Sequence, residues 1–294
     1  MSAVTDDESE IEASRAPLLT HLVELRARLI VSVAAVGIAF VVCFFLADPI
    51  YRFLLRPFQM AAGMVAEQKA GGKHGPFDLL LAMLSGHPGA HGGQKVNLVY
   101  TAPLEFFFTK MKLAGWAGVI VAFPVIAWQL YRFVAPGLYR RERRAFLPFL
   151  IAAPVLFCLG GALVYYVMLP FVLWFSLSQQ IVSPDVQVQL LPRVSDYLDL
   201  VTKLMLGFGL CFQLPVVLSL MGLAGLVDSK QLGRFRRYAV VGIVFVAALI
   251  TPPDPISQCL LAIPIYALYE ASILSVKLIE RSRRREESRA LTAT

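Results

Sequence analysis

Two short charged segments carry the side chains of this chain that are best suited to chemistry. The first covers residues 20–30 and reads Thr-His-Leu-Val-Glu-Leu-Arg-Ala-Arg-Leu-Ile. On a helix its leucines form one apolar stripe, and His21, Glu24 and Arg28 line another face. We expect an amphipathic helix that begins at the membrane surface and continues into an apolar span. From spacing alone, the simpler alternative is a surface helix whose Glu24–Arg28 pair adds a few tenths of a kcal/mol.

The second charged segment covers residues 131–144 and reads Tyr-Arg-Phe-Val-Ala-Pro-Gly-Leu-Tyr-Arg-Arg-Glu-Arg-Arg. Its only carboxylate is Glu142, which lies among four arginines, two on each side. A lone acid in so basic a stretch is either a binding group or a local neutraliser within an anchor for lipid headgroups. The spacing does not decide between these two roles.

Catalytic and metal-binding patterns are missing from the sequence. It has no phosphate-binding G-x-x-x-x-G-K-[ST], no H-E-x-x-H and no G-x-S-x-G, so neither an ATP motor nor an intramembrane protease of those types is indicated. His74, His87 and His91 lie in a Gly-rich stretch, where histidines are common without a ligand role. The four cysteines lie far apart within apolar stretches and read as small core residues. We expect no enzyme activity, no cofactor and no metal.

The elements that hold these segments are membrane spans. The chain is 57% hydrophobic and only 16% charged, which is too apolar for one water-soluble core of 294 residues. The apolar residues fall in six blocks that could cross a bilayer as helices, the last two being short. These blocks are residues 29–47, 106–130, 146–169, 198–223, 238–250 and 259–276. The sequence therefore predicts an all-α integral membrane protein with six transmembrane helices.

The distribution of positive charge predicts the topology. Most of the 27 lysines and arginines lie in segments that share one side of the membrane if the N-terminus is cytoplasmic. This asymmetry predicts that both termini lie in the cytoplasm. Prolines occur in or beside several spans and are expected to kink them, so that the helices form a concave wall. They are Pro124, Pro148, Pro154, Pro170, Pro215 and Pro264.

Three regions are expected along the chain. Residues 1–17 form an acidic cytoplasmic N-terminus without the basic start of a secretory signal peptide. Residues 18–276 form the membrane domain, and residues 277–294 form a charged cytoplasmic tail. Within the membrane domain, residues from about 48 to 101 are expected to form a long external loop, because much of this stretch is rich in glycine and histidine.

The two charged segments, together with a proline-rich hairpin, resemble the TatC family, the multispanning subunit of the twin-arginine protein translocase. The shared motifs are H-L-x-E-L-R at residues 21–26, F-x-A-P-x-L-Y-x-x-E-R-R at residues 133–144 and T-P-P-D at residues 251–254. Their order relative to six spans also matches, and the resemblance covers about residues 18–276. The acidic N-terminus and the charged tail lie outside it.

The resemblance implies a signal-peptide receptor and core scaffold that exports folded proteins across the cytoplasmic membrane, driven by the proton gradient. Two carboxylates would meet the paired arginines of the signal peptide, since a guanidinium makes bidentate contacts that lysine cannot reproduce. The residues implied for this site are Glu24, Arg26, Phe133, Pro136, Leu138, Tyr139 and Glu142.

The resemblance also implies partners: single-span TatA/TatB-type subunits and further copies of this chain, with no role for nucleic acid. Partner helices would contact Leu249, Thr251 and Gln258 near the last hairpin, and Thr251 and Gln258 are expected to be the polar side chains most exposed there. The alternative is that these two side chains only satisfy backbone groups left free by the neighbouring prolines.

One departure from the family affects the fourth span. Many family members carry a glutamate where this chain has Gln213. A glutamine can form hydrogen bonds but cannot titrate, so only a hydrogen-bonding role is expected. The centres of the spans offer mainly Gln213 as a polar group, which disfavours the alternative function, a secondary transporter for a small solute.

Overall fold

The computed structural model describes residues 3–69, 99–100, 102–134, 142–179, 181–182, 187–188, 192–251 and 255–292. Within the helices, the side chains of residues 3–21, 142–147 and 283–292, among others, lie outside this description. The described chain is almost entirely helical, as the sequence predicts. Its first elements are α1 (Ala3–Phe45), α2 (Ala47–Lys69), α4 (Glu105–Val134), α5 (Glu142–Leu163), the π-helical turn η2 (Val164–Met168) and α6 (Leu169–Ser178). Then follow β1 (Ile181–Val182), β2 (Gln187–Val188), α7 (Val194–Cys211), α8 (Leu214–Leu223), α9 (Ser229–Ile250) and α10 (Pro255–Thr292).

Five segments of the described chain are long and apolar enough to cross a membrane. They match five of the six predicted spans, although several extend beyond the expected ends. They are Leu22–Phe45, Glu105–Phe133, Pro148–Ser178, Val194–Leu223 and Ser257–Ser282. The remaining predicted span, residues 238–250, falls in the second half of α9, whose first half carries Lys230, Arg234, Arg236 and Arg237.

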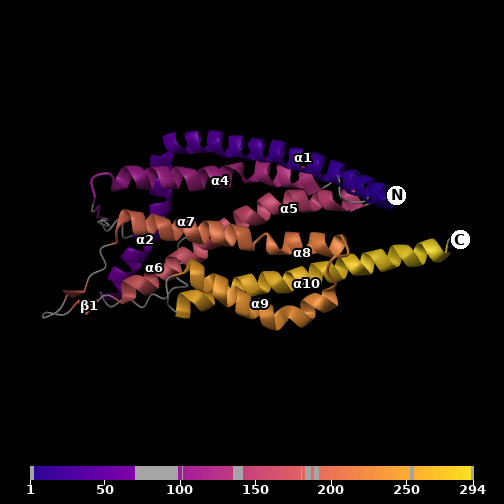
Figure 1. Cartoon of the computed structure of the whole chain (residues 1–294). Helices are drawn as coiled ribbons and strands as arrows, with labels where there is room; N and C mark the ends of the chain where they lie inside the picture. The colour runs from indigo at the N-terminus through magenta and orange to yellow at the C-terminus, as the bar shows by residue number, and fades with distance from the viewer. Residues whose placement is uncertain are drawn as a thin grey trace.

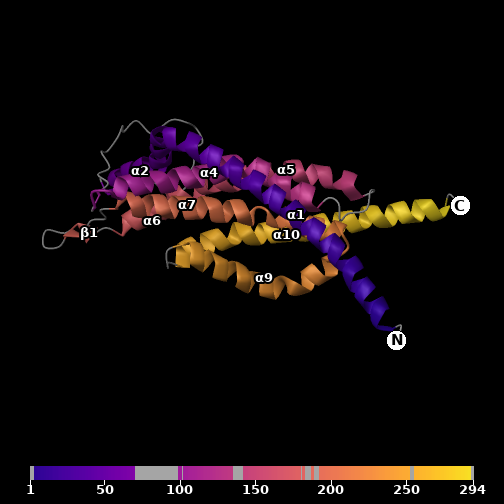
Figure 2. The ribbon, with the colours of Figure 1, turned by 45° about the horizontal axis from the view of Figure 1, so that its top comes forward.

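The helices run lengthwise beside one another, and both termini lie at the same end of the bundle (Figure 1). The end of α4, the start of α5 and the turn from α8 to α9 lie at this end too, while β1, the end of α9 and the start of α10 lie at the opposite end in both views (Figure 2). The segment at residues 20–30 and the end of α4 therefore meet at one end of the molecule.

The stretch from about residue 48 to residue 101, expected to form a long external loop, begins with a helix, because Ala47–Lys69 form α2. Leu54, Phe58, Ala61 and Val65 recur at helical spacing on this segment and are buried. This apolar face packs against α6. The Gly/His-rich residues 70–98 lie outside the described part of the chain.

A proline in α2 explains how this helix is tied to the bundle. Pro57 has no N–H, so the carbonyl of Phe53 loses its normal helical donor. The hydroxyl of Tyr165, in η2, donates to Phe53 O at 2.9 Å. The two rings stack with their centroids 4.3 Å apart. A buried carbonyl left without a donor costs about 1–3 kcal/mol, so this contact stabilises the packing of α2 against the third span.

The fourth predicted span is broken in the middle. Helix α7 ends at Cys211 and α8 begins at Leu214, because Pro215 removes a backbone donor at the start of α8. Upstream of the break, Val201, Leu204 and Phe208 are fully buried and form the centre of the core. The two halves of this span contact different partners: α7 packs on α5 and α4, and α8 packs mainly on α10.

Candidate functional site

The centre of the candidate site is an ion pair on the first turns of the first span. Arg28 donates to Glu24 Oε1 from both Nε, at 3.1 Å, and Nη2, at 2.5 Å. The residues are four apart on α1, so one helical turn brings their side chains together, as the spacing predicts. The ion pair that the simpler alternative supposed is therefore present.

A contact to another helix holds this pair in place. Arg28 Nη1 donates to Gln129 Oε1 at 3.4 Å, which joins α1 to the last turns of α4. The side chains of Arg28 and Glu24 are 20% and 33% exposed, so both are partly withdrawn from solvent while the carboxylate stays accessible. Sequence reasoning did not find Gln129, because it lies 101 residues from Arg28 and belongs to none of the quoted motifs.

The structure describes only some of the other residues predicted for this site. Arg26 is exposed on α1, and Phe133 is half-buried in the last turn of α4, one turn beyond Gln129. The structure thus brings Phe133 to the same helix end as Glu24. Pro136, Leu138 and Tyr139 lie outside the described residues, as does the side chain of Glu142, whose backbone begins α5.

Gln213 lies in the break between α7 and α8, and its side-chain amide forms a hydrogen bond to a neighbouring helix. Its Nε2 donates to the carbonyl oxygen of Ala153 on α5 at 2.9 Å. A partly buried amide that bonds a neighbouring helix stabilises the packing between the two helices. The expected hydrogen-bonding role of Gln213 is consistent with this contact.

At the proline-rich hairpin, one expectation needs correction. Thr251 is not among the most exposed polar residues, because its side chain is 7% exposed and its hydroxyl donates to Ala247 O at 2.9 Å. Gln258 Nε2 donates to Val244 O at 3.1 Å and joins α10 to α9. Both groups donate to backbone carbonyls of α9, but neither carbonyl is one that a proline leaves free: Ala247 O also accepts from the Thr251 N–H at 2.9 Å, and the residue four positions after Val244 is an alanine. These contacts therefore do not match the alternative role. Leu249, by contrast, is 70% exposed on α9.

The view that Gln213 is the main polar group at a span centre is incomplete. Glu270 lies midway along the candidate span Ser257–Ser282. Its Oε2 accepts a hydrogen bond from Arg236 Nη2 of α9 at 2.8 Å, and its Oε1 accepts one from the Tyr266 hydroxyl at 2.9 Å. An acid inside the last apolar block, with a tyrosine four residues earlier, was visible in the sequence. The bond from Arg236 ties α9 to α10, and the bond from Tyr266 lies within α10.

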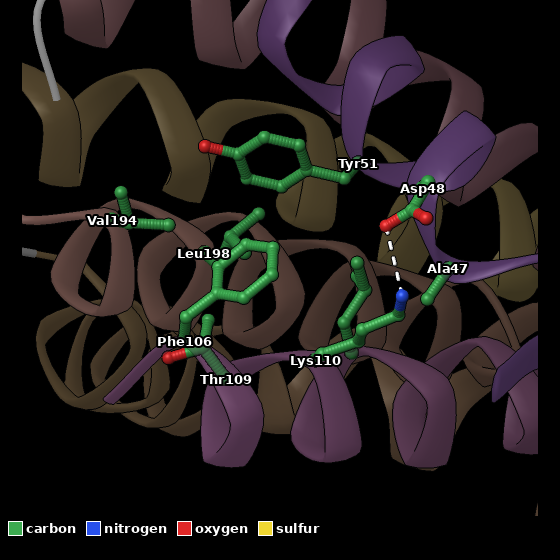
Figure 3. A pocket seen from close by; sticks show the side chains of 9 residues that line it. Ala47, Asp48, Tyr51, Phe106, Thr109, Lys110, Val194 and Leu198 are labelled. Atoms are coloured by element: carbon green, nitrogen blue, oxygen red, sulfur yellow. Dashed lines mark hydrogen bonds and ion pairs between the residues drawn. The ribbon is translucent and has the colours of Figure 1, made fainter. Parts of the chain in front are cut away.

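A second polar cluster lies at the opposite end of the bundle, around a small pocket between α2, α4 and α7 (Figure 3). Lys110 Nζ donates to Asp48 Oδ1 at 2.9 Å across its mouth. Burial, and then the neighbouring Tyr100, raise the pKa of Tyr51, which keeps its proton at neutral pH. The pocket holds about 10 Å³, which is room for a single water and not for a solute.

Comparison with known proteins gives a consistent result. The family model described as "Sec-independent protein translocase protein (TatC)" matches residues 20–264. The Sec-independent protein translocase protein TatC of Magnetococcus marinus is 39% identical over 274 residues, covering 93% of this chain and 89% of that protein. The protein of the same name from Aquifex aeolicus is 34% identical over 272 residues, covering 91% of this chain and 98% of that one.

Solved structures agree with the sequence relatives. A crystal structure titled "Twin Arginine Translocase Receptor- TatC" superposes with a TM-score of 0.68 at 33% identity and covers 88% of this chain and 99% of that one. A second structure of the receptor in the detergent DDM gives a TM-score of 0.67 at the same identity.

Proposed function

The chain belongs to the TatC family of Sec-independent protein translocase proteins, and from this premise we propose that it is the receptor for twin-arginine signal peptides and the core scaffold of the translocase that exports folded proteins. Like the family, it is a multi-pass protein of the cytoplasmic membrane. The observation that carries the proposal is the match over residues 20–264, which includes the segments around Glu24 and Glu142. The name of the superposed receptor structure supports the same role.

The geometry around Glu24 suits a guanidinium ligand. The carboxylate is one-third exposed at the bundle end where α1 and α4 are joined, so a peptide on that face can reach it. Charge-assisted bonds between guanidinium and carboxylate are about twice as strong as neutral ones. We assign Glu24 to one arginine of the signal peptide and Glu142, at the start of α5, to the other. Arg26 and Phe133 border the site, and Pro136, Leu138 and Tyr139 complete its apolar side.

We further propose six spans with both termini in the cytoplasm, the second half of α9 being the fifth in chain order. This half of α9 exposes large apolar side chains, among them Val241, Phe245 and Leu249, as a helix facing lipid does. The location of both termini at one end of the bundle supports an even number of crossings. The basic first half of α9 begins at that same end, in agreement with the positive-inside rule.

The outer face of α9 is proposed as the contact for single-span TatA/TatB-type subunits. Leu249 is its most exposed large apolar side chain near the hairpin, and Gln258 lies on the neighbouring turn of α10. The buried Thr251 would act indirectly, by fixing the end of α9. Movement of cargo would be driven by the transmembrane proton gradient without an enzymatic step in this chain, and further copies of the chain would share the active complex.

Complementation tests the function. Cells that lack their own copy of this subunit receive the gene for this chain together with a folded fluorescent reporter that carries a twin-arginine signal. We expect export of the reporter, and none when the two arginines are replaced by lysines. If the reporter with the intact twin-arginine signal is not exported, although the chain is inserted in the membrane and its single-span partners are present, the proposal is contradicted. Uptake of a small solute into liposomes that contain only this chain would instead favour the secondary transporter.

A further inference from the structure

We propose that Arg28 determines the specificity of the site: by neutralising Glu24, it prevents ordinary cations from binding there and leaves a site that favours a guanidinium. This inference rests on the proposed receptor function. It assigns to a residue of the receptor itself the discrimination between arginine and lysine that a twin-arginine signal requires.

The starting observation is that Glu24 is already paired before any peptide arrives. Both Nε and Nη2 of Arg28 bond to the same oxygen, Oε1, while no hydrogen bond to Oε2 is found among the described residues. A carboxylate offers about four lone-pair sites, so an incoming donor still has Oε2 to bind. The binding position that remains is therefore Oε2 of Glu24, whose negative charge is already balanced by Arg28.

Neutralisation affects ammonium and guanidinium groups differently. A lysine ammonium is a compact, strongly hydrated charge and gains mostly from net electrostatic attraction, which a balanced ion pair does not offer. A guanidinium is planar, is more weakly hydrated and carries five donors in a fixed fork, so it retains directional bonds and can stack on Arg28 and on nearby rings. Removing the net attraction therefore weakens binding of lysine more than binding of arginine, which is how a repulsive element produces specificity.

Gln129 keeps Arg28 in this position. Its Oε1 accepts from Arg28 Nη1, the guanidinium nitrogen that does not contact Glu24, so the guanidinium spans from α1 to α4. Only 20% of the Arg28 side chain is exposed, which prevents it from turning freely into solvent. Gln129 is thus a positioning residue that acts through Arg28.

The experiment compares the binding of two peptides, one with paired arginines and one with paired lysines, to the purified full-length chain in lipid nanodiscs. The variants are Arg28→Gln, Arg28→Lys and Gln129→Leu. The control is Arg132→Gln, which removes one exposed positive charge from the end of α4 at the same bundle end. The readout is the dissociation constant of the lysine peptide divided by that of the arginine peptide. A change in packing alone would alter both constants together and leave this ratio unchanged.

We expect the ratio in Arg28→Gln to fall by about tenfold, the size of one charge-assisted hydrogen bond, through tighter binding of the lysine peptide. Gln129→Leu should lower the ratio by less than Arg28→Gln does, and so should Arg28→Lys, which keeps the charge but lacks the fork that bonds both Glu24 and Gln129. Arg132→Gln should stay near wild type. An unchanged ratio in Arg28→Gln would overturn the inference, as would an equal fall in Arg132→Gln. A wild-type chain that binds both peptides alike would instead contradict the receptor function itself.

If Arg28→Gln fails to fold, Gln129→Leu still tests the inference. The charge of Arg28 is then retained but its position is not fixed, and the ratio must still fall. The salt dependence gives a second test: binding of the lysine peptide to Arg28→Gln should weaken as salt rises, because it then depends on net attraction to an unpaired carboxylate.

Discussion

Replacing Gly118 by alanine should force α1 away from α4. A Cβ at this position would lie 2.9 Å from the backbone nitrogen of Phe40 and 3.0 Å from its Cα, whereas ordinary contacts begin at 3.4 Å. Both obstructing atoms belong to the backbone of α1, so a change of rotamer cannot relieve the clash. The helices would have to separate by about 0.5 Å at this crossing to restore normal contact.

The cost of this separation follows from the tight packing of the pair. Overpacking a close helix contact costs about 1–3 kcal/mol, which exceeds the gain in helix propensity of up to about 1 kcal/mol from replacing glycine. The Arg28–Gln129 contact is already 3.4 Å long and should break when α1 moves. The variant is therefore expected to lose stability and to hold Glu24 less firmly.

The same helix provides a matched control. A Cβ at Gly115, one turn earlier on α4, would meet nothing within 4 Å. Unfolding by denaturant in mixed micelles should show Gly118→Ala destabilised by about 1–3 kcal/mol relative to Gly115→Ala. Equal stability of the two variants would refute the close approach of α1 and α4 at this point.

Three further predictions concern other contacts. Replacing Gln213 by leucine removes the bond to Ala153 O and should lower the free energy of unfolding by about 1 kcal/mol, measured in the same micelles. Glu280 accepts a hydrogen bond from the backbone N–H of Ser229 at 2.6 Å. Glu280→Ala should therefore lower the free energy of unfolding by about 1 kcal/mol, and Glu280→Gln by less, measured by denaturant in the same micelles. Leu249→Ala should reduce co-purification of single-span partners without altering stability, while Val241→Ala, which is 69% exposed, should leave co-purification unchanged; equal losses would contradict a contact centred on Leu249.

Much of the fold could be predicted from the sequence, because hydropathy and proline placement act locally. A run of about 20 apolar residues has few alternatives to a membrane helix, so five predicted spans correspond to five candidate spans of the structure. The helix α2 was missed because its buried apolar positions are separated by polar residues and a proline, and because their burial depends on packing against the distant α6.

The candidate site could be predicted only where its contacts are local. The Glu24–Arg28 pair follows from a spacing of four residues on a helix and is confirmed. Gln129 was missed because its contact depends on how α1 and α4 pack, which no short motif encodes. The burial of Thr251 has the same cause: the way the end of α9 packs determines its exposure.

Crosslinking of a signal peptide to the two carboxylates tests the central claim most directly. A peptide with a photoreactive group beside its paired arginines is added to membranes containing wild type, Glu24→Ala or Glu142→Ala, with a paired-lysine peptide as control. We predict a strong crosslink to wild type that is lost with either alanine and with the lysine peptide. Crosslinks of equal strength in all four cases would show that the acidic pair does not bind the signal, and would contradict the assigned site.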